Sequence, residues 1–137
     1  MREHAHDIAS LLQTAGLRST QQRLTLGALL FDGTHKHRTA EQVFAAARKA
    51  KARVSLATVY NTLHQFTEAG LLREVVIDAN RVYFDTNTET HHHFFDETSG
   101  HLSDVPASAI QISRLPKPPA GSELDRVDVV IRIRSRA

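Results

Sequence analysis

The stretch that decides the fold reads Ser55-Leu56-Ala57-Thr58-Val59-Tyr60-Asn61-Thr62-Leu63-His64. Its apolar residues Leu56, Val59 and Leu63 recur at the spacing of one helix face. Ser55 is a favoured helix N-cap, and Gly70 is a natural C-terminal stop. The stretch therefore predicts an amphipathic helix that runs to about Ala69.

The face of this helix opposite the apolar residues carries small, hydroxyl and amide side chains, which let a helix lie deep in a groove. Tyr60 offers a ring to thymine methyl groups and a hydroxyl to phosphate, and Asn61 can pair with an adenine edge. Arg18 and Arg23 could contact phosphates. The candidate DNA-binding residues are Arg18, Arg23, Ser55, Thr58, Tyr60 and Asn61.

Three further helices are predicted before this one, and a β-hairpin after it. The first helix covers residues 4–15, and capping boxes at Ser19 with Gln22 and at Thr39 with Gln42 open the next two. Residues 33–38 are predicted to be a polar loop. The hairpin strands are predicted over residues 71–77 and 81–84. Helices followed by a hairpin are the order of a winged-helix domain, so residues 1–84 are predicted to bind DNA.

Residues 85–137 are predicted to form a second, smaller domain. A strand over His91–Phe95, a short helix over residues 106–115 and a strand over residues 127–133 are expected. A unit of this size buries little core alone, so we expect it to pair with a second copy. The fold class is then α+β: an N-terminal winged-helix DNA-binding domain followed by a small α/β dimerisation domain.

The composition excludes several chemistries, because the chain has no Cys and nine His. Disulfides, thiol nucleophiles, Cys-bound zinc and iron–sulfur clusters are ruled out, so His, Asp and Glu must hold any metal. Residues 1–84 carry 11 Lys and Arg against 7 Asp and Glu, whereas residues 85–137 carry 6 against 8. A basic first part and an acidic, His-bearing second part suggest a module that binds nucleic acid joined to one that binds a cation.

The three consecutive histidines are the strongest metal signal. Strand geometry puts His91 and His93 on one face, about 7 Å apart, and His92 on the other. Carboxylates from Asp85, Asp96 or Asp104 could complete a mixed nitrogen and oxygen site for Fe, Mn or Zn. Imidazole also ligates haem iron.

No nucleophile–base set, Walker loop or His-Glu-x-x-His motif is present, so we do not expect an enzyme. A His/Asp metalloenzyme is the alternative from another class, but it would leave the basic helical part without a role. No run of 18 apolar residues and no signal-like segment is found, so no membrane association and a cytoplasmic location are expected.

Several motifs, in order, resemble those of the ferric uptake regulator (Fur) family. They are Gly16-Leu17-Arg18-x-Thr20-x-Gln22-Arg23, His37-x-Thr39-Ala40-Glu41, Ala57-Thr58-Val59-Tyr60-Asn61-Thr62-Leu63, Gly70-Leu71 and His91-His92-His93. The resemblance covers essentially the whole chain. It implies a repressor that binds AT-rich double-stranded DNA as a homodimer or higher oligomer. It also implies that Arg18 reaches the minor groove.

The regulatory metal site of the family maps onto His37, Asp85, His91, His93 and Asp104. A metal ion bound by both domains would fix the angle between them, and hence the spacing of two recognition helices. Relatives usually carry a Cys-x-x-Cys that holds structural zinc, but Asp96 and Ser99 stand at those positions here. The resemblance therefore implies no structural Cys-bound zinc.

Within the family, the chain looks most like the iron response regulator (Irr) branch. The features that carry this likeness are Asp85-Thr86-Asn87-Thr88 ahead of His91-His92-His93-Phe94-Phe95, and the closing Val127-Asp128-Val129-Val130-Ile131-Arg132. The branch implies control of iron homeostasis and haem biosynthesis genes, with activity at low iron and inactivation by haem at His91, His92 and His93. The alternative within the family is a repressor that depends on Fe(II) or Mn(II).

Overall fold

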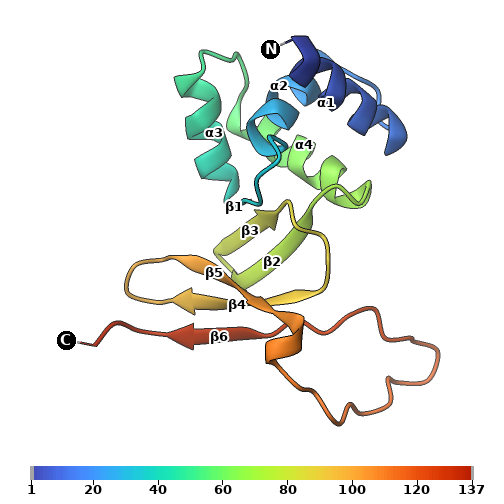
Figure 1. Ribbon diagram of the computed structural model, residues 1–137, viewed down its shortest axis with the longest axis vertical. Coiled ribbons are helices and arrows are strands. Elements are labelled where there is room, and N and C mark those ends of the chain that lie inside the picture. Colours follow the sequence, from blue (N-terminus) through green and yellow to red (C-terminus); the bar gives the residue numbers. More distant parts are fainter. Residues whose placement is uncertain (1, 137) are drawn as a thin grey trace. The chain divides into compact units, whose positions relative to one another are not determined.

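The computed structural model describes residues 2–136, and Figure 1 shows its elements in chain order. The chain divides into two compact units, Met1–Thr88 and Glu89–Ala137. Within residues 2–136 the elements are four α-helices, one short 3₁₀ turn and two three-stranded sheets. The α+β class predicted from the sequence is therefore confirmed. No helix in this part of the chain is long and apolar enough to cross a membrane.

The four helices all belong to the first unit. They are α1 (Arg2–Thr14), α2 (Gln21–Leu30), α3 (Ala40–Lys49) and α4 (Leu56–Glu68). The capping box predicted at Thr39 is present: the Thr39 hydroxyl accepts from the Gln42 amide at 3.2 Å, and the Gln42 side chain accepts from the Thr39 amide at 3.0 Å. The cap predicted at Ser19 lies one residue later, at Thr20. The Thr20 carbonyl accepts the first intrahelical bond, from Leu24, so Thr20 is the residue at the helix boundary.

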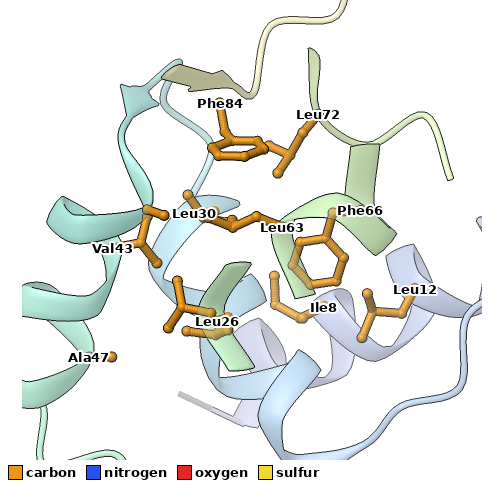
Figure 2. Packing of buried hydrophobic residues seen from close by; sticks show 12 residues of the cluster. Ile8, Leu12, Leu26, Leu30, Val43, Ala47, Leu63, Phe66, Leu72 and Phe84 are labelled. Atoms are coloured by element: carbon orange, nitrogen blue, oxygen red, sulfur yellow. The ribbon is translucent and has the colours of Figure 1, made fainter. Parts of the chain in front are cut away.

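The core of the first unit lies between the helices and one face of its sheet. Figure 2 shows Phe84 and Leu72, from the sheet side, lying over Leu30 and Leu63. All four side chains are buried, and so is Phe66 on α4. Burial of each such side chain contributes about 1.5–3 kcal/mol, so this cluster fixes how α4 is held against the sheet.

The sheet of the first unit has the order β1-β3-β2. The predicted hairpin is present as β2 (Arg73–Asp78) and β3 (Arg81–Asp85). The prediction of a polar loop over residues 33–38 is wrong for its last two residues. They form a short strand, β1 (His37–Arg38), which pairs with β3. Asp85 is the last residue of β3 and lies opposite His37, so it belongs to the first unit rather than starting the second.

The second unit holds β4 (His91–Asp96), β5 (Leu102–Pro106) and β6 (Val130–Ile133), in the order β5-β4-β6. The helix predicted over residues 106–115 is wrong: only a 3₁₀ turn at Ala107–Ala109 forms. Ile112 and Leu115 are exposed, so no burial offsets the cost of ordering a helix there. The preceding residues instead form β5, which hydrogen-bonds one edge of β4.

We predict that Gly27→Ala destabilises the first unit, although alanine is the better helix former by about 1 kcal/mol. A β-carbon on Gly27, in α2, would lie 2.8 Å from Cγ2 of the buried Ile8 in α1. Overpacking of this kind costs about 1–3 kcal/mol, and a β-branched side chain has few rotamers in which to yield. Urea denaturation should therefore show a net loss of about 1 kcal/mol in the free energy of unfolding.

The matched background is Ile8→Ala, which removes Cγ2. There, Gly27→Ala should be neutral or stabilising, because only the gain in helix propensity remains. A Gly27→Ala variant that is more stable than the wild type would show that this close approach of α1 and α2 is absent.

Candidate functional site

Helix α4 and its N-cap carry the first group of candidate residues, and two of these, Ser55 and Thr58, form the cap of the helix. The Ser55 hydroxyl accepts from the Thr58 amide at 3.0 Å and donates to the Thr58 hydroxyl at 2.9 Å. Ser55 is therefore the predicted N-cap. Val59 and Leu63 are buried as expected, whereas Leu56 is only half-buried. Asn61 is exposed on the other face.

Tyr60 is held by a residue outside the candidate DNA-binding set. Its hydroxyl donates to a carboxylate oxygen of Glu41, in the first turn of α3, at 2.6 Å. This hydrogen bond raises the pKa of Tyr60 and lowers the pKa of Glu41. The sequence places Glu41 in the motif His37-x-Thr39-Ala40-Glu41 and after the Thr39 cap, where an acidic residue is expected for helix stability, and neither signal indicates a contact with Tyr60.

Arg23 connects the start of α2 to α4. Its guanidinium donates to the Gln65 side-chain oxygen at 3.1 and 3.2 Å, and to the Arg18 carbonyl at 3.0 Å. A polar hollow of about 250 Å³ lies between the two helices. It is lined by Thr20, Gln22, Arg23, Thr58, Asn61, Thr62 and Gln65. The structure thus brings Arg23, Thr58 and Asn61 together, and it adds Gln65, which sequence reasoning missed.

The second unit holds three of the candidate metal ligands on one face of its sheet. The His91 and His93 rings lie 4.5 Å apart between centroids. In each, Nε2 lies 3.4 Å from the same Oδ1 of Asp104, which is opposite His93 in the register of β4 and β5. Both histidines are buried. His92 points to the other face, as predicted, where its Nδ1 accepts from the Val129 amide at 3.2 Å.

The first unit holds the other two candidate ligands. His37 lies opposite Asp85 in the β1–β3 pair, and a ring nitrogen and a carboxylate oxygen of the two lie within 4.8 Å of each other. Asp85 is fully buried, and its Oδ1 accepts from the Asn87 amide at 2.9 Å. The register also puts the buried Arg73 of β2 opposite Asp85, and a buried carboxylate needs cationic or hydrogen-bonding neighbours of this kind.

Asp96 is not part of the ligand group, although the sequence kept it as a candidate. Its Oδ1 accepts from the amides of Thr98 and Ser99 at 2.8 and 3.3 Å, which lowers the pKa of the Asp96 carboxyl. In the same turn, the Thr98 hydroxyl accepts from the Ser135 amide at 3.1 Å. Asp96 and Ser99 therefore close the β4–β5 turn by hydrogen bonds. The chain has no cysteine that could hold a metal ion there.

The comparison with protein families decides the assignment: the model of the ferric uptake regulator family matches residues 14–122. The chain belongs to the ferric uptake regulator family. The peroxide-responsive repressor PerR of Staphylococcus aureus is 35% identical over 102 residues, which cover 74% of this chain and 68% of that protein. Members of the ferric uptake regulator family are transcription regulators rather than enzymes.

Solved structures of the ferric uptake regulator family have the same fold. The regulator from Pseudomonas aeruginosa, determined with manganese, is 27% identical and has a TM-score of 0.71. That match covers 95% of this chain and 98% of the other. The regulator from Vibrio cholerae is 20% identical, with a TM-score of 0.72 over 93% and 98% of the chains, and shows the fold alone.

The role of Ser55 yields a prediction that separates helix capping from DNA contact. Ser55→Ala should lower the free energy of unfolding by about 1 kcal/mol, because the Thr58 amide loses its acceptor. Ser55→Asp should keep the stability, because aspartate caps equally well, while its charge repels phosphate and weakens binding to DNA. Thermal denaturation and DNA titration of both variants measure the two effects. Equal stability of Ser55→Ala and the wild type would contradict the capping role.

Proposed function

We propose that this chain is a DNA-binding transcription regulator whose affinity for its operators depends on a divalent metal ion. The proposed ligands are His37, Asp85, His91, His93 and Asp104. The first unit would bind DNA, and the second would dimerise and sense. The observation that carries the proposal is the approach of two buried histidine rings to a single oxygen of Asp104.

The tautomer of the His91 ring decides what its Nε2 presents to Asp104. Its Nδ1 lies 2.6 Å from the Glu89 carbonyl oxygen, which can only accept, so Nδ1 carries a proton. In the neutral ring, Nε2 then presents a lone pair toward the Asp104 carboxylate. A lone pair and a carboxylate repel each other unless a cation lies between them or the ring takes a second proton. A backbone carbonyl that fixes the distal ring nitrogen is also the usual support of a metal-ligating histidine.

The distances within the second unit fit a shared metal ion. Charge-assisted N–H···O bonds are about 2.7–2.9 Å long, whereas both Nε2–Oδ1 distances here are 3.4 Å. Two ligands bound to one tetrahedral ion at about 2.0–2.1 Å lie about 3.4 Å apart. A set of imidazoles and carboxylates suits Fe, Mn or Zn. When bound, the ion would supply a positive charge that His37 and Asp85 of the first unit could share.

The proposed DNA interface is the exposed face of α4 together with the start of α2. Tyr60 and Asn61 would contact base edges, and Arg18 and Arg23 would contact phosphates. Ser55 and Thr58 would add contacts at the start of α4, beyond their role in the cap. Operators rich in A·T pairs are proposed from the thymine methyl and adenine contacts that Tyr60 and Asn61 can make.

We further propose that the second unit forms a homodimer through the face of its sheet opposite His93. Phe94 on β4 is 36% exposed and Ile133 on β6 is 42% exposed, and the register puts both side chains on this face beside Ile131. A sheet of this size leaves such side chains uncovered unless a second surface packs on them. A dimer would present two recognition helices, and hence bind two half-sites.

The second candidate is the response of the iron response regulator branch, in which haem bound at His91, His92 and His93 inactivates the protein. The observation that favours it is His92, which is buried in the same strand yet lies outside the metal-ligand set. Each of the three rings already contacts a protein group, so haem would have to displace the contacts to Glu89, Val129 and Asp104. His92 therefore separates the two candidates.

The test is operator affinity, measured by fluorescence anisotropy on an AT-rich duplex at fixed salt concentration. We expect Mn(II), or Fe(II) without oxygen, to tighten binding by about tenfold or more, a shift within the usual range of such couplings, and chelator to reverse it. His93→Ala and Asp104→Asn should lose this response. His101→Ala, an exposed histidine outside the set, is the matched control and should retain it.

The same binding assay, repeated with haemin and with His92→Ala, distinguishes the metal proposal from the haem candidate. The metal proposal predicts that His92→Ala keeps the full metal response. The haem candidate predicts that haemin weakens operator binding by the wild type and that His92→Ala abolishes this effect. Operator affinity that is the same with metal, chelator and haemin would contradict both candidates, while leaving DNA binding intact.

A further inference from the structure

The contact between Tyr60 and Glu41 joins the proposed reading face of α4 to the first turn of α3. The phenol oxygen and the carboxylate oxygen are 2.6 Å apart, which is the length of a strong O–H···O⁻ hydrogen bond. Glu41 is ionised and can only accept, so the single hydroxyl proton of Tyr60 lies on the Glu41 side. The capping box at Thr39 fixes the turn that carries Glu41.

The direction of this hydrogen bond limits what Tyr60 can offer to DNA. With its proton donated to Glu41, the phenol oxygen presents only lone pairs to other partners. It can then accept from the amino groups of adenine or cytosine in the major groove. It cannot donate to a phosphate oxygen, to thymine O4 or to guanine O6.

We propose that Glu41 sets the hydrogen-bonding direction of Tyr60, so that Tyr60 acts as an acceptor and selects a base with a major-groove amino group, adenine or cytosine. The inference rests on the proposed DNA-binding function and gives that function a source of base preference. Glu41 is a positioning residue, because it acts through Tyr60.

The negative charge of Glu41 also disfavours a contact between the Tyr60 hydroxyl and a phosphate. A phosphate that approached the Tyr60 hydroxyl would also approach the Glu41 carboxylate, and two anions at such short range repel each other. Glu41 thus keeps the Tyr60 hydroxyl at a base edge rather than on the DNA backbone. The raised pKa of Tyr60 and the lowered pKa of Glu41, each caused first by their mutual hydrogen bond, agree with this assignment of the proton.

The first readout needs no DNA. The chain has two tyrosines. The ultraviolet tyrosinate titration is therefore measured for each Glu41 variant with and without Tyr60→Phe. The difference between the two curves gives the titration of Tyr60. We expect the pKa of Tyr60 to fall toward the ordinary value of 10.0 in Glu41→Ala. Glu41→Gln keeps an acceptor oxygen without the charge and should give an intermediate result.

The second readout is base preference, measured with duplexes in which each operator position is varied in turn. The wild type should prefer adenine or cytosine at one position by about fivefold to tenfold, the scale of a single good base contact. Glu41→Ala and Tyr60→Phe should lose this preference, and Glu41→Gln should keep it. Glu68→Ala, which removes an exposed charge at the other end of α4, should strengthen binding to every duplex equally and keep the preference.

Two outcomes would overturn the inference. One is a Glu41→Ala variant that still binds DNA and whose base preference equals that of the wild type. The other is a wild-type chain that binds no duplex at all, which would overturn the proposed function and this inference together. An unchanged preference in a variant that still binds DNA overturns the inference alone.

Discussion

A histidine opposite an aspartate across two antiparallel strands is the constraint on which the proposed metal chemistry depends. Among residues 2–136 the arrangement occurs once in each unit, as His37 with Asp85 and as His93 with Asp104. Directly opposed residues have β-carbons about 4.5–5.5 Å apart, close enough for both side chains to bind one ion. A slip of one residue would turn one member of each pair to the other face of its sheet. Buried neighbours, Phe84 beside Asp85 among them, hold this register.

The buried core also sets the positions of the exposed side chains of α4. Its buried face fixes the helix against the sheet, and its cap fixes where the first turn begins. The exposed face therefore presents Tyr60 and Asn61 in set positions, and α3 adds the acceptor that orients the Tyr60 hydroxyl. Preorganisation of this kind lowers the cost of ordering side chains on binding, because their partners are already in place.

The sequence predicts the features that arise from local periodicity and capping. Four helices, the Thr39 capping box, the hairpin and the face shared by His91 and His93 all follow from spacing. The missed elements lack such a signal: β1 has two residues, and β5 gains its pairing only from β4. The Tyr60–Glu41 contact spans 19 positions and needs the packing of α3 on α4. The predicted helix over residues 106–115 has apolar residues, but no surface that buries them.

The central claim is that one metal ion binds ligands of both units, and a distance between the units tests it most directly. Because the chain has no cysteine, Lys49→Cys and His101→Cys create the only two thiols for spin labels. Labelled chains diluted with unlabelled chains report the distance within one protomer by pulsed electron paramagnetic resonance. Zn(II) should narrow the distance distribution, and chelator or Asp104→Asn should broaden it. The same distribution with zinc and with chelator would contradict the claim.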